Sequence, residues 1–297
     1  MTSMSGAALM LPADLNHLKQ NLWAQSQPQM AIATGKSDKT EPEKLVTEAL
    51  KSMGGMKRFV GRGDVVVIKP NMAWDRTPEY AANTNPEVVA SLIKMCFDCG
   101  ASKVKLFDHT VNDTRRSYRQ SGIQTVAENL GATMVHMDQR KFKEMKINGN
   151  TLKKWPVYTE LFEADRIINV PIAKHHSKSR LTMSIKNWMG VIGGRRSKLH
   201  WNLDENLVDL ARFIKPTLTV LDAVRILTNN GPQGGSLAYV KRLNTIAVGT
   251  DQVAVDSFGC TLFGMTGNDL KYVRLAGAEK LGEVNFNKLN IKKVSVS

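Results

Sequence analysis

The sequence contains little cysteine, and this excludes several classes of protein. Only Cys96, Cys99 and Cys260 occur in 297 residues, and three cysteines cannot form a disulfide framework without leaving one over. Cys96 and Cys99 form a Cys-x-x-Cys at the carboxyl end of a predicted helix, whereas a redox pair needs the amino end, where the dipole lowers a thiol pKa. We interpret both as ordinary helix residues. We expect no intrinsic iron–sulfur cluster, because the four-cysteine spacing is missing.

Long apolar runs and the familiar catalytic motifs are also missing. No stretch of 18 or more apolar residues occurs, so we expect no membrane span. The sequence has no Gly-x-Ser-x-Gly elbow, no Gly-x-Gly-x-x-Gly, no kinase signature and no phosphate-loop motif. Standard nucleophilic, nicotinamide-dependent and kinase mechanisms are therefore not favoured.

Acidic residues are outnumbered by basic ones. The chain has 41 Lys and Arg against 27 Asp and Glu, a formal net charge of +14, which attracts anionic partners over long range. The cations are spread over residues 51–62, 141–154, 174–198 and 288–293 and match no nucleic-acid-binding motif. We predict an anionic small molecule as the partner and no specific nucleic acid. The oligomeric state is left open.

The amino-terminal segment is set apart by its composition. Residues 6–13 are small and apolar, like the end of an export signal, but no basic segment precedes them. We expect residues 1–28 to be a poorly ordered signal remnant and residues 29–297 to form the folded domain. As written, the sequence indicates a cytoplasmic protein; an export signal upstream of Met1 would make it periplasmic.

From residue 29 onward, β-rich runs alternate with helical patterns, which favours a sheet covered by helices. The predicted strands are 30–34, 64–69, 103–107, 133–137, 166–170, 217–222, 245–249 and 292–297. The predicted helices are 41–53, 86–99, 114–130 with a break near Gly122, 158–162, 204–214, 252–263 and 268–281. Residues 139–155 are charged and carry a turn at Asn148-Gly149, so we expect a hairpin insertion there. The sequence thus predicts an α/β fold: a mixed, mostly parallel sheet with helices on both faces, in a single compact domain with an insertion.

Polar side chains follow four predicted strands. Lys69-Pro70-Asn71 ends one strand, Asp108-His109 the next, Lys174 to His176 follow a third, and Asp222 ends a fourth. In open parallel sheets, ligands bind beyond the carboxyl ends of the strands. These side chains are therefore candidates for one site.

Each of these groups has alternative interpretations. Lys69 and Asn71 could bind a phosphate or carboxylate. Alternatively, they are solvated residues at the end of a strand without a functional role. Asp108 and His109 could be ligands of a divalent metal or an acid–base pair. Alternatively, the Asp108 side chain forms hydrogen bonds within its own turn. His175 and His176 are adjacent, so only one of them faces a given site on a strand. The metal candidates are Asp108, His109 and His176, but no zinc-ligand spacing occurs.

The segment after the histidines carries a second polar pattern. Thr182, Ser184 and Lys186 alternate with apolar residues, which predicts a strand with these three on one face and Asn187 at its end. Gly190 and the pair at 193–194 would then form an anion cradle.

Two further features are candidates with a structural alternative. Gly231 opens a glycine-rich turn that is either a lid or a close approach of backbone to ligand. Asp256 lies inside a predicted helix, where a charge is either catalytic or buried for structural reasons.

These motifs together resemble the DUF362 family. The resemblance rests on Val67–Asn71, Asn169–His176, Thr182–Gly190, Asn230–Gly234 and Gly249–Asp256, and extends over about residues 30–290. It implies that the residues matching the family's central motif belong to the site, with His175 in place of a threonine. These residues are Lys174, His176, Thr182, Lys186, Asn187 and Gly190.

The family's function is not known, and two features of its members differ here. Many relatives carry an added ferredoxin-like iron–sulfur module, and others have twin-arginine export signals. This chain lacks the cysteine module, so the resemblance implies at most a redox partner protein that supplies a cluster.

Our leading hypothesis is a ligand- or metal-dependent enzyme or accessory factor that acts on an anionic small molecule in a redox-related pathway. Lysines would neutralise the anion, asparagines would orient it, and His176 with Asp108 would carry protons or a divalent metal. The predicted catalytic residues are Lys174, His176, Lys186 and Asp108. The predicted ligand-binding residues are Lys69, Asn71, Asn187, Thr182, Gly190, Asp222, Gly231 and Asp256. The alternative is a non-catalytic protein that delivers a metal, a cofactor or an iron–sulfur redox partner.

Overall fold

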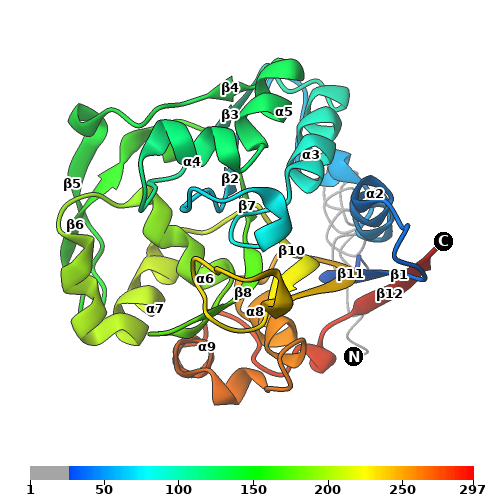
Figure 1. Ribbon diagram of the computed structural model, residues 1–297. Coiled ribbons are helices and arrows are strands. Elements are labelled where there is room, and N and C mark those ends of the chain that lie inside the picture. The colour runs from blue at the N-terminus through cyan, green and yellow to red at the C-terminus, as the bar shows by residue number, and fades with distance from the viewer. Residues whose placement is uncertain (1–26) are drawn as a thin grey trace, which may run out of the picture.

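The computed structural model describes residues 27–297 and contains one large sheet with helices on both of its faces (Figure 1). Residues 1–26, which include the segment interpreted as a signal remnant, lie outside the described residues. The strands are β1 (Met30–Gly35), β2 (Val65–Pro70), β3 (Lys103–Leu106), β4 (Thr133–Met134), β5 (Phe142–Lys146), β6 (Lys154–Tyr158), β7 (Arg166–Val170), β8 (Ile172–His176), β9 (Arg180–Thr182), β10 (Leu218–Leu227), β11 (Val240–Gly249) and β12 (Ile291–Val296). The helices are α2 (Pro42–Ser52), α3 (Pro86–Asp98), α4 (Thr114–Gln120), α5 (Ile123–Asn129), α6 (Ser184–Asn187), α7 (Leu203–Phe213), α8 (Gln252–Thr261) and α9 (Lys271–Ala278).

The strand order of the large sheet is β12-β1-β11-β10-β7-β2-β3-β4, and β8 pairs with β10 and β9 beside this path. The pairs β1–β12, β7–β10, β8–β10, β2–β3, β2–β7 and β3–β4 are parallel, whereas β1–β11, β10–β11 and β8–β9 are antiparallel. The predicted mixed, mostly parallel sheet is therefore confirmed. The predicted hairpin insertion is the separate β5–β6 pair.

Two helical layers form because strand side chains alternate between the faces of the sheet. In β2, Val66 and Ile68 pack into the core beneath α2, α3 and α5, whereas Val67 packs on the opposite side, toward α7. The run of β-branched residues in β2 is what a strand covered on both faces requires. The sheet is thus buried in its middle, and its polar side chains gather at the strand ends.

Helix boundaries follow local signals. Asn85 accepts the N–H of Glu87 at the start of α3, and Asp251 accepts those of Val253 and Ala254 at the start of α8, which are N-caps. The helical pattern 114–130 is broken at Gly122, whose φ of 74° requires glycine. No helix within residues 27–297 is both long and apolar enough to cross a membrane.

The strand predicted from the alternation of Thr182, Ser184 and Lys186 is wrong. Only Arg180–Thr182 is extended, and the chain turns into α6 at Ser184. The reason is Asp256, whose carboxylate accepts the N–H groups of Ser184 at 2.6 Å and Ile185 at 2.9 Å. It thereby satisfies free N–H donors of a helical turn. An aspartate 72 and 71 residues away from these donors cannot be foreseen from period-two spacing.

The segment after Pro171, in contrast, is a strand. Residues 172–176 form β8, which pairs with β10 in parallel and with β9 in antiparallel orientation. Because Lys174 and His176 are two residues apart on this strand, they lie on one face. Both face the cavity described below, together with residues that follow β2 and β3.

Candidate functional site

A cavity of about 460 Å³ opens where β2, β3 and β8 end. Ten of the residues predicted from the sequence line it: Lys69, Asn71, Asp108, His109, Lys174, His176, Thr182, Lys186, Asn187 and Gly190. They come from three separate stretches of the chain that the sheet brings to one edge. The other three predicted residues, Asp222, Gly231 and Asp256, do not line it.

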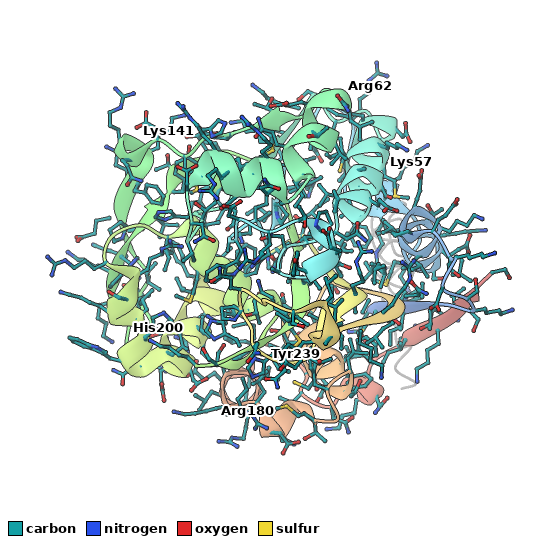
Figure 2. All side chains as sticks on the ribbon, viewed as in Figure 1. Lys57, Arg62, Lys141, Arg180, His200 and Tyr239 are labelled. Atoms are coloured by element: carbon teal, nitrogen blue, oxygen red, sulfur yellow. The ribbon has the colours of Figure 1, made fainter. Side chains whose placement is uncertain are left out.

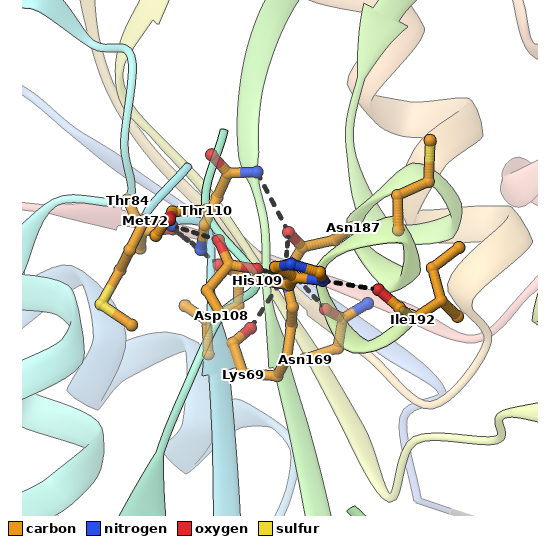
Figure 3. A network of polar contacts seen from close by, with 12 residues as sticks. Lys69, Met72, Thr84, Asp108, His109, Thr110, Asn169, Asn187 and Ile192 are labelled. Atoms are coloured by element: carbon orange, nitrogen blue, oxygen red, sulfur yellow. Dashed lines mark hydrogen bonds and ion pairs between the residues drawn. The ribbon is translucent and has the colours of Figure 1, made fainter. Parts of the chain in front are cut away.

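Lys69 and Asp108 form a buried ion pair at this cavity (Figure 3). Lys69 Nζ lies 2.9 Å from Asp108 Oδ1, and the side chains are 0% and 1% exposed. Asp108 Oδ2 accepts the N–H of Met72 at 2.6 Å. Burial lowers the pKa of Lys69, and the charge of Asp108 opposes that shift. Asp108, predicted to carry a proton or a metal, is thus engaged with a lysine and a backbone amide.

Asn187 holds the lysine in place. Its Oδ1 accepts from Lys69 Nζ at 2.7 Å and from Asn71 Nδ2 at 3.2 Å, and its Nδ2 donates to the carbonyl of Lys69 and to Asn169 Oδ1 (Figure 3). Its amide therefore already has four partners in the protein. Asn169 did not figure among the predicted site residues, although an amide inside the apolar strand 166–170 was a signal for it.

Lys174 and Lys186 differ from Lys69 because they lack a carboxylate partner. Lys174 Nζ donates to Asn71 Oδ1 at 3.0 Å and to the carbonyl of Ala82, and Lys186 Nζ contacts Met189 Sδ at 3.4 Å. Within residues 27–297, neither Nζ has an Asp or Glu oxygen within 4.0 Å. The side chains are nevertheless buried, with residue exposures of 1% and 6%.

Burial is the main cause of the altered pKa values of these two lysines. It lowers the pKa of Lys174 to about 7, a shift that Asp108 opposes and that the charges of Lys186 and Lys69 reinforce. It lowers the pKa of Lys186 to about 8, reinforced by Arg196 and opposed by Asp204. Both lysines therefore exchange protons near neutral pH.

His176 is a neutral imidazole with a defined tautomer. Burial, together with Lys186 and Lys174, lowers its pKa to about 2. Its Nδ1 accepts the backbone N–H groups of Lys178 at 3.1 Å and Ser179 at 3.4 Å, so the single ring proton belongs on Nε2. His176 is therefore a hydrogen-bond donor at Nε2. This tautomer does not suit the predicted role as metal ligand, because it has no free lone pair.

His109 has the opposite arrangement. Its Nδ1 lies 2.7 Å from the carbonyl of Ile192, and a carbonyl only accepts, so the proton is on Nδ1 and Nε2 carries the lone pair. Burial and the charge of Arg196 lower its pKa. The cavity thus holds one imidazole that donates and one that accepts.

Gly190 is required by the close packing of the ion pair. A Cβ at this position would lie 1.7 Å from Asp108 Oδ1 and 2.6 Å from Lys69 Nζ. Its carbonyl accepts the N–H of His109 at 2.7 Å. Gly190, which was predicted to be part of an anion-binding loop, therefore packs directly against Lys69 and Asp108.

The two predicted aspartates outside the cavity bond to backbone N–H groups. Asp222 accepts the N–H groups of Asn85 at 2.7 Å and Val224 at 3.0 Å, and burial raises its pKa to about 6. Asp256 holds the first turn of α6, and burial raises its pKa to about 8. Asp256 thus acts on the helix that carries Lys186 and Asn187, whereas the partners of Asp222, at the start of α3 and in β10, do not line the cavity.

Gly231 packs against β8 instead of lining the cavity. A Cβ there would lie 1.8 Å from the carbonyl oxygen of His175, and the N–H of Gly231 donates to His175 Nδ1 at 3.0 Å. The next residue, Pro232, does line the cavity.

Trp74, Arg196 and His200 are among the cavity residues that were not predicted. Arg196 donates to the carbonyls of His109 at 2.7 Å and Thr110 at 2.6 Å, which fixes the loop after β3. Burial lowers the pKa of His200. Trp74 lies in a loop, and Arg196 and His200 lie in the 3-10 helix Arg196–Asn202; the signal for this region in the sequence was the basic composition around Arg196.

No metal-binding group of three or more His, Cys, Asp or Glu side chains occurs in the part of the chain that the structure describes. Other cations lie on different sides of the molecule: Figure 2 labels Lys141, Arg180 and, near each other, Lys57 and Arg62. Among the described residues, the buried lysines Lys69, Lys174 and Lys186 all line the cavity.

Comparisons with known sequences agree with the motifs. The model of a domain of unknown function, DUF362, matches residues 66–261. A curated relative, the thylakoid-associated protein sll1697 of Synechocystis sp., is 27% identical over 216 residues, which cover 70% of this chain and 65% of that protein. The match thus spans less than two thirds of that relative's length.

Comparisons with solved structures give more distant matches. A crystal structure of a protein from Thermotoga maritima has a TM-score of 0.47 at 12% identity, with 76% of this chain and 60% of the other covered. The lactate racemase apoprotein from Thermoanaerobacterium thermosaccharolyticum has a TM-score of 0.45 at 13% identity, with 80% and 57% covered. We transfer no activity from either.

Proposed function

The chain belongs to the DUF362 family, and we propose that its cavity binds an anionic small molecule through Lys174 and Lys186. The observation that carries the proposal is the burial of these two cations without a carboxylate partner. Taking a charge out of water costs several kcal/mol unless another charge or hydrogen bonds compensate it. An anion in the cavity supplies that compensation.

The surrounding donors favour an oxyanion. Beside the two ammonium groups, His176 offers its Nε2–H, and Thr182 offers a buried hydroxyl that has no partner among residues 27–297. Charge-assisted hydrogen bonds from such donors to an oxyanion are about twice as strong as neutral ones. The +14 net charge of the chain adds long-range attraction for the same ligand.

The same side chains can move a proton, so the proposal includes catalysis. Lys174, with a pKa of about 7, is present as ammonium and as free amine at neutral pH, which suits a general base or acid. His109 presents a lone pair at Nε2 and His176 a proton at Nε2. Proton transfer to or from the bound anion is the reaction type that these groups support.

Lys186→Met tests the binding proposal. Because Lys186 has no carboxylate partner, we expect the variant to be as stable as the wild type within about 1 kcal/mol, or more stable, since replacing a buried charge by an apolar group of similar volume is often neutral or stabilising. A panel of acetate, benzoate, phosphate and phenyl phosphate is screened by thermal unfolding and calorimetry. An anion at about 100 times its Kd stabilises the wild type by about 2.7 kcal/mol, and Lys186→Met loses this gain.

Lys198→Met is the matched control, because it removes the same charge from an exposed position outside the cavity. It should keep the stabilisation by anions. The proposal is wrong if no anion of the panel stabilises the wild type, or if Lys186→Met responds as strongly as Lys198→Met.

A further inference from the structure

The cavity has several polar side chains at its most buried positions. Lys174, Thr182 and Lys186 are 1%, 4% and 6% exposed, whereas Val111, which also lines the cavity, is 57% exposed. We call these three buried residues the floor. Pockets for small molecules are mostly lined by apolar side chains with a few polar groups. Here the floor is polar, and the parts of the lining nearer to solvent contain apolar side chains together with the exposed polar residues Ser177, Lys178 and Ser197.

The floor contains an unused hydrogen-bonding group. Thr182 Oγ1 is buried and has no hydrogen-bond partner among the described residues, although buried hydroxyls are nearly always bonded. Among the described residues, Lys186 Nζ has one hydrogen-bond partner, the weak acceptor Met189 Sδ. A headgroup with several oxygen atoms satisfies both at once.

The apolar wall consists of Trp74, Val111 and Met189. Trp74 and Val111 lie on the loops after β2 and β3, which brace each other: the N–H of Val111 donates to the carbonyl of Ala73 at 2.9 Å, and Asn83 bonds the N–H and the carbonyl of Trp74. Met189 adjoins the floor through its contact with Lys186. The backbone of the two loops that carry Trp74 and Val111 is therefore held by hydrogen bonds within the protein, from the Asn83 side chain and between the loops.

The cavity is too large for an inorganic anion alone. Its volume of about 460 Å³ equals the share of about 15 water molecules in the liquid at about 30 Å³ each. A bare carboxylate or phosphate on the floor would leave the apolar wall in contact with water.

We infer that the ligand is an amphipathic organic anion that enters with its oxyanion headgroup first. This inference rests on the proposed function and adds the chemical class of the ligand. The headgroup, a carboxylate or a phosphate, contacts Lys174, Thr182 and Lys186, and an apolar body lies along Trp74, Val111 and Met189.

The test is a series of ligands with a constant headgroup and a growing apolar part. Acetate, butanoate, hexanoate and octanoate are titrated into the full chain by calorimetry, and inorganic phosphate, glycerol 2-phosphate and phenyl phosphate form a second arm. Burying one methylene contributes about 0.8 kcal/mol, which is about a fourfold gain in affinity. We therefore expect about fourfold tighter binding per methylene, and tighter binding of phenyl phosphate than of glycerol 2-phosphate. The arm with the tighter ligands identifies the headgroup.

Trp74→Ala locates the apolar body. The hydrogen bonds at position 74 involve only its backbone, so the wall loop should persist. We expect acetate to bind within twofold of the wild type, while the gain per methylene falls below twofold. Trp201→Ala is the matched control, because Trp201 is 82% exposed and does not line the cavity. Val111→Ser gives a second measurement if Trp74→Ala does not fold.

The outcomes separate the two proposals. If all carboxylates bind with equal affinity, the amphipathic ligand is wrong and anion binding stands. If none of the anions binds, the proposed function fails as well. If Trp201→Ala reduces the gain in affinity per methylene and Trp74→Ala does not, the assignment of the apolar wall is wrong.

Discussion

Buried charges occur around Glu160 and around Lys174, and the two regions compensate them differently. Glu160 is 5% exposed and accepts Lys105 at 3.1 Å and Lys141 at 2.5 Å. Burial alone would raise its pKa, but the two lysines hold it below its usual value. Those lysines retain contact with solvent, with side-chain exposures of 15% and 46%. Around Lys174, in contrast, Lys174 and Lys186 are buried, and among the described residues the one carboxylate that lines the cavity, that of Asp108, is paired with Lys69.

This difference indicates what each region does. The Glu160 cluster is complete within the protein, so its ion pairs serve the structure of the β5–β6 side. The Lys174 cluster lacks such partners, and because unpaired buried charges are costly, our proposal is that an anion compensates them. Burial of charge is thus not in itself a sign of a site; burial without a partner is.

The largest expected loss of stability comes from removing the carboxylate partner of Lys69, which leaves this lysine unpaired like Lys174. Asp108→Ala removes the carboxylate from a fully buried lysine, and breaking a buried pair in this way costs about 3–5 kcal/mol. Equilibrium unfolding in urea measures the loss. The double variant Lys69→Met/Asp108→Ala should recover most of it, because neither charge then remains. A loss below about 1 kcal/mol for Asp108→Ala would show that Lys69 does not depend on its partner.

A smaller effect is expected from crowding the same ion pair. Gly190→Ala places a Cβ where Asp108 Oδ1 lies, and overpacking typically costs about 1–3 kcal/mol. Gly235→Ala is the control, since a Cβ at position 235 meets no atom within 4 Å. Urea unfolding should separate the two variants by at least about 1 kcal/mol. Equal stabilities would mean that the α6 segment shifts without cost.

The fold could be predicted from the sequence because its signals are local. The β-branched run of β2, the cap at Asn85 and the break at Gly122 are each visible within a few residues. The helical conformation of α6 could not be predicted, because Asp256, which holds its first turn, is 72 and 71 residues away from Ser184 and Ile185. Likewise, lysines and asparagines at strand ends indicated that they share one edge of the sheet. They did not indicate that the Asn187 amide is hydrogen-bonded to Lys69 and Asn169. Nor did they indicate which ring nitrogen of His109 and of His176 has no partner within the protein. Such details depend on long-range contacts.

The last difference between the two regions is their response to pH. Near neutral pH, Lys174 and Lys186 titrate, with pKa values of about 7 and about 8, and an anion binds best when both are charged. Raising the pH from 6 to 9 removes these protons, so the affinity for a carboxylate should fall, by up to about tenfold per pH unit for each lysine above its pKa. His176 does not contribute, because its imidazole is neutral throughout this range.

Calorimetry between pH 6 and 9, in two buffers of different ionisation enthalpy, measures both the affinity and the protons taken up on binding. Lys186→Met should lack the step near pH 8. Its remaining step should move above pH 7, because the charge of Lys186 lowers the pKa of Lys174. An affinity that stays constant from pH 6 to 9 would contradict the participation of both lysines, since a bound anion must raise the pKa of any ammonium group that it contacts.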